Sequence, residues 1–124
     1  SNTPALAVLR KKIEYASKKG WIRTLDGRRV YVRSPHSALN FLLQSAGSII
    51  ATRAWVIFHN LARSLEYKQL GVIHDESQIE CDPAIADEIG RLVVKAKEQT
   101  TEYYILNCPI TGEYKVGRSW NETH

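Results

Sequence analysis

The sequence His74-Asp75-Glu76 sets two carboxylates and an imidazole in consecutive positions. Carboxylate oxygens are ligands that a hard divalent cation such as Mg²⁺ prefers, so the tripeptide is a candidate metal site. Apolar residues flank it, Leu70 and Val72 before and Ile79 and Cys81 after, which predicts a hairpin with the tripeptide as its turn. Most acidic turns are only hydrated, and one carboxylate is a poor Mg²⁺ site without further ligands, so the local pattern leaves both interpretations open.

A second group of polar residues has helical spacing. The steps between its members are four, four and three residues, which places His36, Asn40, Gln44 and Gly47 on one face of a helix. Side-chain amides both donate and accept hydrogen bonds, so Asn40 and Gln44 are suited to the acceptors on a base-pair edge. Gly47 would allow another backbone or a nucleic acid to come close. The alternative is a hydrated helix face with a glycine at a helix crossing.

Basic side chains are concentrated near one end of the chain. Residues 10–33 hold nine of them against only Glu14 and Asp26, a local charge of +7 that leaves −3 for the rest of a chain whose net charge is +4. Such a cluster suits a phosphate backbone, because neutralising phosphates releases counterions, although a solvated surface has the same composition. Trp21 lies within the cluster, where it either packs or stacks on a base.

Composition limits the class of protein. A chain of 124 residues is long enough for one compact domain, and 44% hydrophobic with 24% charged residues is ordinary for a soluble one. Cys81 and Cys108 lie far apart, which favours two small buried thiols in a reducing compartment over a disulfide or zinc framework. The first four residues do not resemble a signal peptide. We expect a cytoplasmic protein without a membrane partner, because polar residues interrupt the apolar stretch 38–58 at Asn40, Gln44 and Arg53.

The pattern of apolar residues and turn residues predicts an α+β fold, in which a small antiparallel sheet packs with three main helices. The first helix starts at Thr3-Pro4 and stops near Gly20, and Asp26-Gly27 marks a hairpin after it. The second helix is the long central one. It starts at Ser34-Pro35 and runs to about Glu66, with an apolar stripe at Leu39, Leu42, Leu43, Ala46, Ile50, Ala54, Ile57, Phe58, Leu61 and Leu65. A third helix starts at Asp82-Pro83, and a final strand is expected near Tyr103 to Cys108.

Taken in order, four segments resemble family A DNA polymerases, and most closely the phage replicative type. They are 24–30 (TLDGRRV), 34–40 (SPHSALN), 43–47 (LQSAG) and 74–76 (HDE). The ending, Gly117-Arg118-Ser119-Trp120 running to His124, is similar to the ending of those chains. The resemblance covers nearly the whole sequence and implies that residues 1–124 form the carboxy-terminal palm segment, the part of the enzyme that carries motif C.

The resemblance implies a role for each matching residue. Asp75 would be the motif C aspartate that binds the catalytic Mg²⁺ ions, with Glu76 as an auxiliary carboxylate and His74 near the primer terminus. The polar helix face would contact the minor groove around the newest base pair, where acceptor positions barely depend on sequence. The residues involved would be His36, Asn40 and Gln44. Arg28 and Arg29 would hold the DNA backbone. Ser77 occupies a position that is usually apolar in the family.

Several parts of such an enzyme have no counterpart in the sequence. Two-metal catalysis needs a second aspartate from motif A, and the incoming deoxynucleoside triphosphate needs the fingers helix. Thumb and exonuclease domains are absent too. The expectation is therefore a fragment or subunit that is inactive alone, binds primer-template DNA, and works with a partner polypeptide carrying motif A and the fingers. Two alternatives remain, a non-catalytic DNA-binding module and a self-associating module whose sheet edge pairs with another copy, both keeping the palm fold.

Overall fold

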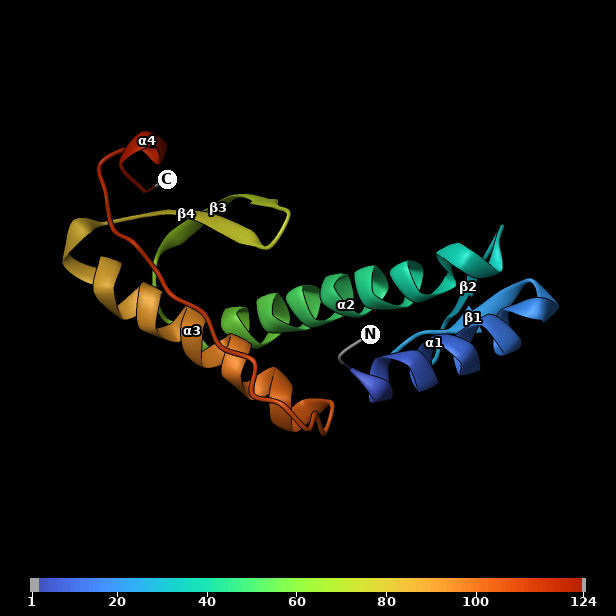
Figure 1. Cartoon of the computed structure of the whole chain (residues 1–124). Helices are drawn as coiled ribbons and strands as arrows, with labels where there is room; N and C mark the ends of the chain where they lie inside the picture. The colour runs from blue at the N-terminus through green and yellow to red at the C-terminus, as the bar shows by residue number, and fades with distance from the viewer. Residues whose placement is uncertain (1–2, 124) are drawn as a thin grey trace. The chain divides into compact units, whose positions relative to one another are not determined.

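The computed structural model of the protein describes residues 3–123 and has the expected α+β composition (Figure 1). Where the sequence analysis expected one small sheet, the described residues form two separate two-stranded antiparallel sheets. The chain divides between Ile49 and Ile50 into two compact units, each with one of these hairpins. The boundary falls inside the long helix α2 (Ala38–Leu61).

The first unit begins with helix α1 (Pro4–Ala16), followed by a short 3₁₀ turn over Ser17–Lys19. Pro4 lies in the first turn as predicted, but the Thr3 side chain makes no capping hydrogen bond. Gly20 ends the helical segment with φ of +87°, a conformation that glycine adopts without steric cost. The predicted apolar stripe of α1 is used only toward its carboxyl end, because Leu6 and Leu9 are 46% and 36% exposed.

The first hairpin pairs strand β1 (Trp21–Arg23) with strand β2 (Arg29–Tyr31). Its loop follows from the sequence: the Gly27 N–H bonds to the Thr24 carbonyl, and Gly27 itself has φ of +86°. A turn closed in this way by a left-handed glycine is the usual three-residue hairpin loop. Ile22 and Val30 point to the other face of the strands from Trp21 and build the small core of this unit, which consists of Ile22, Val32 and Ala38 with Ile13, Val30 and Leu42 against them.

A 3₁₀ turn over Pro35–Ser37 leads into α2, so the predicted start at Ser34-Pro35 is confirmed. The Ser34 side chain makes no capping bond. Instead its carbonyl accepts from the backbone N–H and hydroxyl of Ser37. The helix ends at Leu61, earlier than expected, and part of the predicted stripe is not buried: Leu43 is 54% exposed.

By length and composition alone, the helical span Pro35–Leu61 is apolar enough to cross a membrane. The core helix of a soluble protein has the same length and composition, so this is weak evidence for a span. The expectation that the chain has no membrane partner stays a prediction.

The second unit contains strands β3 (Tyr67–Ile73) and β4 (Glu76–Cys81), a 3₁₀ turn at Pro83–Ile85, and helices α3 (Ala86–Tyr103) and α4 (Trp120–Thr123). The Asp82 carboxylate accepts from the Ala84 N–H, which confirms the predicted start of the third helix. Phe58 of α2 and Ala62, just after the end of that helix, pack with Ile89 and Ala96 of α3 in the core. Aromatic rings extend this core, with ring centroids 5.0–5.9 Å apart among Trp55, Phe58, His59 and Tyr67.

The predicted strand from Tyr103 to Cys108 is wrong. Helix α3 continues to Tyr103, and the Tyr104 and Leu106 N–H groups still bond back to the carbonyls of Thr100 and Thr101. The β propensity of tyrosine and isoleucine is overridden here by tertiary packing, since the Arg53 guanidinium lies 4.4 Å from the Tyr103 ring. Cys108 follows this turn and is exposed, contrary to the expected burial, whereas Cys81 is half-buried.

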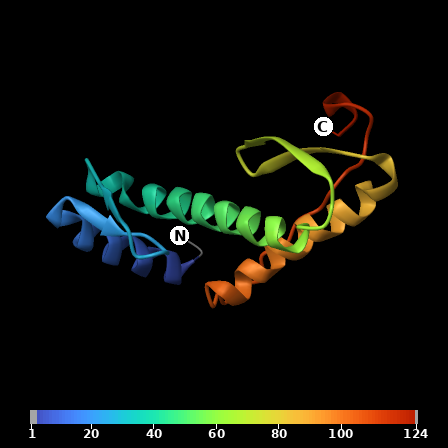
Figure 2. The same ribbon diagram turned by 180° about the vertical axis from the view of Figure 1, so that it is seen from behind.

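After α3 the chain turns back and runs along that helix (Figure 2). The contacts occur in reverse order along α3: Ile110 donates to Thr101, Thr111 donates to Glu98, and the Tyr114 hydroxyl donates to Asp87. The Tyr114 ring lies directly over Gly90, where an added Cβ would come 2.2 Å from the ring. A glycine at position 90 is therefore required by packing.

Candidate functional site

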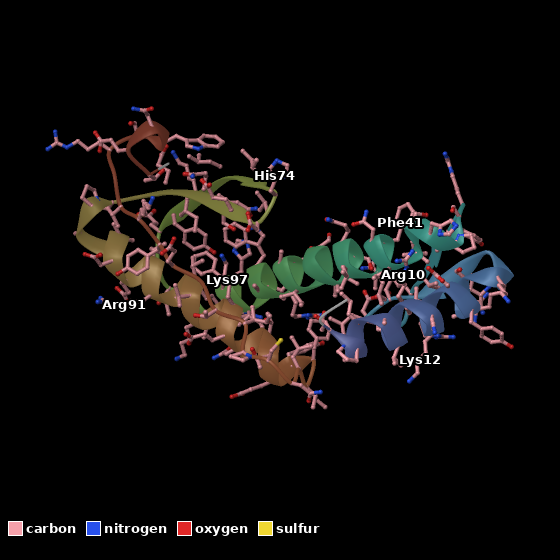
Figure 3. All side chains as sticks on the ribbon, in the orientation of Figure 1. Arg10, Lys12, Phe41, His74, Arg91 and Lys97 are labelled. Atoms are coloured by element: carbon pink, nitrogen blue, oxygen red, sulfur yellow. The ribbon has the colours of Figure 1, made fainter. Side chains whose placement is uncertain are left out.

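The β3–β4 hairpin carries His74-Asp75-Glu76 at the end where Figure 3 labels His74. Its turn contains two residues, His74 and Asp75, because Glu76 already pairs with Ile73 as the first residue of β4. His74 has φ of +57°, an uncommon conformation for a residue with a side chain. His74 and Asp75 are exposed. Glu76 is half-buried and accepts a hydrogen bond from the side-chain amide of Gln78. The three residues are therefore neighbours, but only two of them form the tip.

Asp75 also borders a small hollow behind the turn, with a volume of about 20 Å³. The other lining residues come from α2, from the hairpin and from α3: Ala51, Ala54, Trp55, Phe58, Val72, Ser77, Val93 and Lys97. Ser77 lines the same hollow as Asp75, together with six apolar residues and Lys97. Lys97 was not among the residues predicted to lie near the turn. Its spacing of four from Val93 and eight from Ile89 puts it on the apolar stripe of α3, which is the signal that would have identified it.

The described residues hold no group of three or more histidine, cysteine or acidic side chains that is able to hold a metal ion. Asp75 is accessible and offers one carboxylate, with Glu76 next to it. Mg²⁺ takes six ligands in an octahedron and usually keeps several waters, so one or two protein carboxylates are a normal share of its site. The turn therefore fits as a part of a magnesium site, and the remaining protein ligands would have to come from outside residues 3–123.

The polar face of the central helix belongs to the first unit. His36 lies in the 3₁₀ turn, and Asn40, Gln44 and Gly47 lie on α2, as the spacing predicted. All four are exposed. Within residues 3–123 no atom lies within 4 Å of a Cβ built on Gly47, so this glycine is not at a helix crossing in the described part of the chain. The face is open to a ligand.

Some basic residues of segment 10–33 form ion pairs in the structure and others do not. Arg10 pairs with Glu14 at 2.8 Å, and Arg28 pairs with Asp26 at 2.7 Å. These two pairs use both acids of the segment, so seven of its nine basic side chains have no carboxylate partner within the described part of the chain. They are Lys11, Lys12, Lys18, Lys19, Arg23, Arg29 and Arg33, and all are exposed.

Asp26 is held by its neighbours in the loop. The Thr24 hydroxyl, the Arg28 N–H and the Arg28 Nε donate to its carboxylate. These contacts lower the pKa of Asp26 below its ordinary value, with the Thr24 hydroxyl as the largest cause. Arg28 is thus engaged in the structure of its own loop. The predicted pair of DNA-binding arginines is therefore not equivalent, since Arg29 has no such partner among the described residues.

A larger hollow of about 580 Å³ lies over α3, between Arg91 and Lys95 on the helix and Tyr114 on the returning segment. It contains none of the residues that the sequence analysis singled out. Its charges are mixed, because Glu98 and Glu113 line it together with the basic residues. No chemistry is assigned to it.

The chain is similar in sequence to several known proteins. The DNA-directed DNA polymerase of Enterobacteria phage T3 is 34% identical over 99% of this chain, and that of Escherichia phage T7 is 32% identical over 99%. The thermostable DNA polymerase I of Thermus thermophilus is 29% identical over 92%. The chain spans about a fifth of the length of the phage relatives, 21% in each case. No protein-family model matches the chain.

A solved structure shares the fold. The POL domain of Pol1 from M. smegmatis, in complex with DNA primer-template and dNTP, superposes with a TM-score of 0.76 at 22% identity. The match covers 97% of this chain and 23% of that one. Over nearly its whole length, the chain is homologous to the family A DNA polymerases of phages and of the bacterial DNA polymerase I type.

Proposed function

We propose that the chain is the palm segment of a DNA-directed DNA polymerase and that Asp75 is its ligand for the catalytic Mg²⁺ ions. The observation that carries the proposal is an exposed aspartate at the tip of a two-residue hairpin turn, in a chain homologous to these enzymes over nearly its whole length. Glu76 is the auxiliary carboxylate, oriented by the amide of Gln78.

When bound, the Mg²⁺ ions would supply charge neutralisation on the phosphates and alignment of the reacting groups. The role of Asp75 is to provide a negatively charged oxygen as a ligand, at a position that the pairing of the two strands fixes. An exposed tip suits this role, because the ions and the phosphates must approach from outside the hairpin. His74 is the neighbour of Asp75 on the same tip and is assigned to the primer terminus.

The polar face of α2 is the second part of the proposal. His36, Asn40 and Gln44 are exposed at helical spacing, and the space over Gly47 is open. We assign them to the minor groove of the primer-template, where hydrogen-bond acceptors occur at similar positions for every base pair. The seven unpaired basic residues of the first unit attract the phosphate backbone of the same duplex.

Activity requires more than these residues. A single turn with one or two carboxylates does not hold two ions, and no larger acidic cluster occurs within residues 3–123. We therefore assign the second aspartate and the binding of the deoxynucleoside triphosphate to another part of the enzyme. That part is either a partner polypeptide or a further region of the same polypeptide, and the present chain alone is expected to show no primer extension.

The test is primer extension by a chimera in which this chain replaces its counterpart in the phage T3 polymerase. We expect the chimera to extend a primer and the isolated chain not to. Asp75→Asn should slow the chimera on the order of a thousandfold, because the amide keeps the shape but not the charge. Glu80→Gln is the matched control: it removes one negative charge from the same hairpin, at an exposed ion pair with Lys68.

Two results would contradict the proposal. Template-dependent extension by the isolated chain would show that it holds a complete site. An Asp75→Asn chimera that worked as fast as the Glu80→Gln chimera, with both melting at the wild-type temperature, would show that the turn is not the metal site.

A further inference from the structure

The outer face of the first hairpin gathers three cations around one aromatic ring. The Lys19 Nζ lies 3.8 Å from the centroid of the Trp21 ring, the Arg29 Cζ lies 4.3 Å from it, and the Arg23 Cζ lies 5.9 Å from it. Cations within about 6 Å of an indole face are attracted by the ring quadrupole. Trp21 therefore holds long, flexible basic side chains close to one another.

The strand register explains why these residues meet. Trp21 is opposite Tyr31, and Arg23 is opposite Arg29, so all four side chains share the face turned away from Ile22 and Val30. Like charges directly opposite each other destabilise a strand pair. Arg23 and Arg29 therefore repel each other in the folded hairpin. Neither forms an ion pair with a carboxylate within the described residues.

The same contacts make base stacking on Trp21 unsuitable. Two cations already lie within 4.3 Å of the ring centroid, so a base would have to displace them to stack there. A phosphate is different, because it would lie among the cations without displacing them from the ring. An anion would also remove the repulsion that the register imposes.

We infer that Lys19, Trp21 and Arg29 form a clamp for a DNA phosphate, in which the two cations bind the phosphate oxygens and Trp21 is a positioning residue. The inference rests on the proposed function for the identity of its ligand, duplex DNA. It also distinguishes two neighbouring arginines. Arg28 is tied to Asp26 at 2.7 Å and lies outside the clamp, whereas Arg29 lies within it.

The experiment measures binding of a labelled short DNA duplex to the full chain at several salt concentrations. Arg29→Gln should lower the affinity about tenfold and reduce the salt slope by about one, because one phosphate contact is lost. Arg28→Gln is the matched control. It removes the same charge from the same hairpin and should lower the affinity at most about threefold.

Trp21 is tested without any change of charge. Trp21→Leu should lower the affinity about threefold, since the cations lose the ring that holds them, and Trp21→Phe should restore most of the loss. Thermal unfolding of each variant checks that the hairpin is intact. Because leucine and phenylalanine are both apolar, a difference between them reports on the ring and not on burial.

The clamp would be overturned if Arg29→Gln and Arg28→Gln bound DNA equally well, or if Trp21→Leu and Trp21→Phe were indistinguishable. Either result, together with normal extension by the T3 chimera, would leave the proposed function standing. A wild-type chain that did not bind the duplex at all would overturn the clamp and the backbone contacts proposed for the basic residues, but not the role of Asp75.

Discussion

The two hairpins each carry an aspartate at the turn, and the surroundings of the two carboxylates differ. Asp26 accepts hydrogen bonds from the Thr24 hydroxyl and from the N–H and guanidinium of Arg28. Asp75 makes no hydrogen bond or ion pair with any residue in the described range 3–123. The same residue type at the same kind of place is thus structural in one hairpin and available to a ligand in the other. Partners, and not the residue type, make the difference.

Each of the two turns contains a residue with a positive φ, and the residue type differs between them. The first turn uses Gly27, which adopts φ of +86° freely, and the second uses His74 at φ of +57°. A residue with a side chain in this region costs about 1–2 kcal/mol relative to its ordinary conformation. Strained residues of this kind cluster at functional sites, although Ile105 at φ of +53° shows that they also occur elsewhere in this chain. The first turn is therefore built for stability, and the second retains a side chain at a cost in stability.

The largest expected effect comes from exchanging the two aspartates for asparagine in the T3 chimera. Asp75→Asn should reduce primer extension on the order of a thousandfold and leave the melting temperature unchanged, because its carboxylate has no partner to lose. Asp26→Asn should lower the melting temperature and leave most of the activity. Extension rates and thermal unfolding of both variants measure this. If Asp26→Asn abolished extension in a fully folded chimera, the contrast between the hairpins would be wrong.

The turn residues provide the next effect, on stability alone. Gly27→Ala should destabilise the chain by about 1–2 kcal/mol, since alanine is strained at this positive φ. His74→Gly should have the opposite sign and stabilise it by at most about 1 kcal/mol, because the relief of strain exceeds the entropy that glycine costs. Urea unfolding of the two variants decides the matter. A destabilised His74→Gly variant would mean that the imidazole makes a stabilising contact.

A smaller effect is expected on the polar face of α2. Gln44→Ala removes a neutral hydrogen bond to the minor groove, worth on the order of 1 kcal/mol, so the chimera should extend about fivefold more slowly. Mismatched primer ends should be handled differently from matched ones. Thr52→Ala on the same helix serves as a control for helix stability. Equal rates for the Gln44→Ala and wild-type chimeras on matched and mismatched primers would remove Gln44 from the DNA interface.

The smallest effect is a pH dependence of the first hairpin. Hydrogen bonds, first that of Thr24, lower the pKa of Asp26 below its ordinary value of 3.8. A carboxyl with a lowered pKa in the folded state stabilises the protein at pH above its unfolded value, and this contribution is lost as the pH falls through the folded value. Wild type should therefore lose more stability than Asp26→Asn in that acidic range. Parallel pH profiles of urea unfolding for the two would argue against this role of Asp26.

Local sequence was sufficient for several elements. The starts of the helices at Pro4, at Ser34-Pro35 and at Asp82-Pro83 were predicted, as were both hairpins, although the turn of the second is one residue shorter than predicted. Proline in the first helical turn and glycine at a positive φ act through the backbone of a few neighbouring residues, so their effect does not depend on the rest of the fold. The ordered motifs from 24–30 to 74–76 indicated the family because they are similar through common ancestry, and not through a local effect on the backbone.

Tertiary structure decided what depends on residues distant in the sequence. Residues 104–108 do not form a strand, because the hydrogen bonds of α3 continue and Arg53 packs on Tyr103 from another helix. The requirement for Gly90 arises only from the Tyr114 ring, which the returning segment places over it. Lys97 lies behind the turn of the β3–β4 hairpin because α3 packs there.

The clearest example of a difference decided by tertiary structure is the pair Arg28 and Arg29, which had the same predicted role. Composition determined that this segment is basic and where along the chain its charge lies. Only the folded loop turned Arg28 toward Asp26, and only the strand register placed Arg29 beside Trp21. Arg28 lies in the loop and Arg29 begins strand β2, so adjacent residues of one type acquire different partners once the hairpin forms.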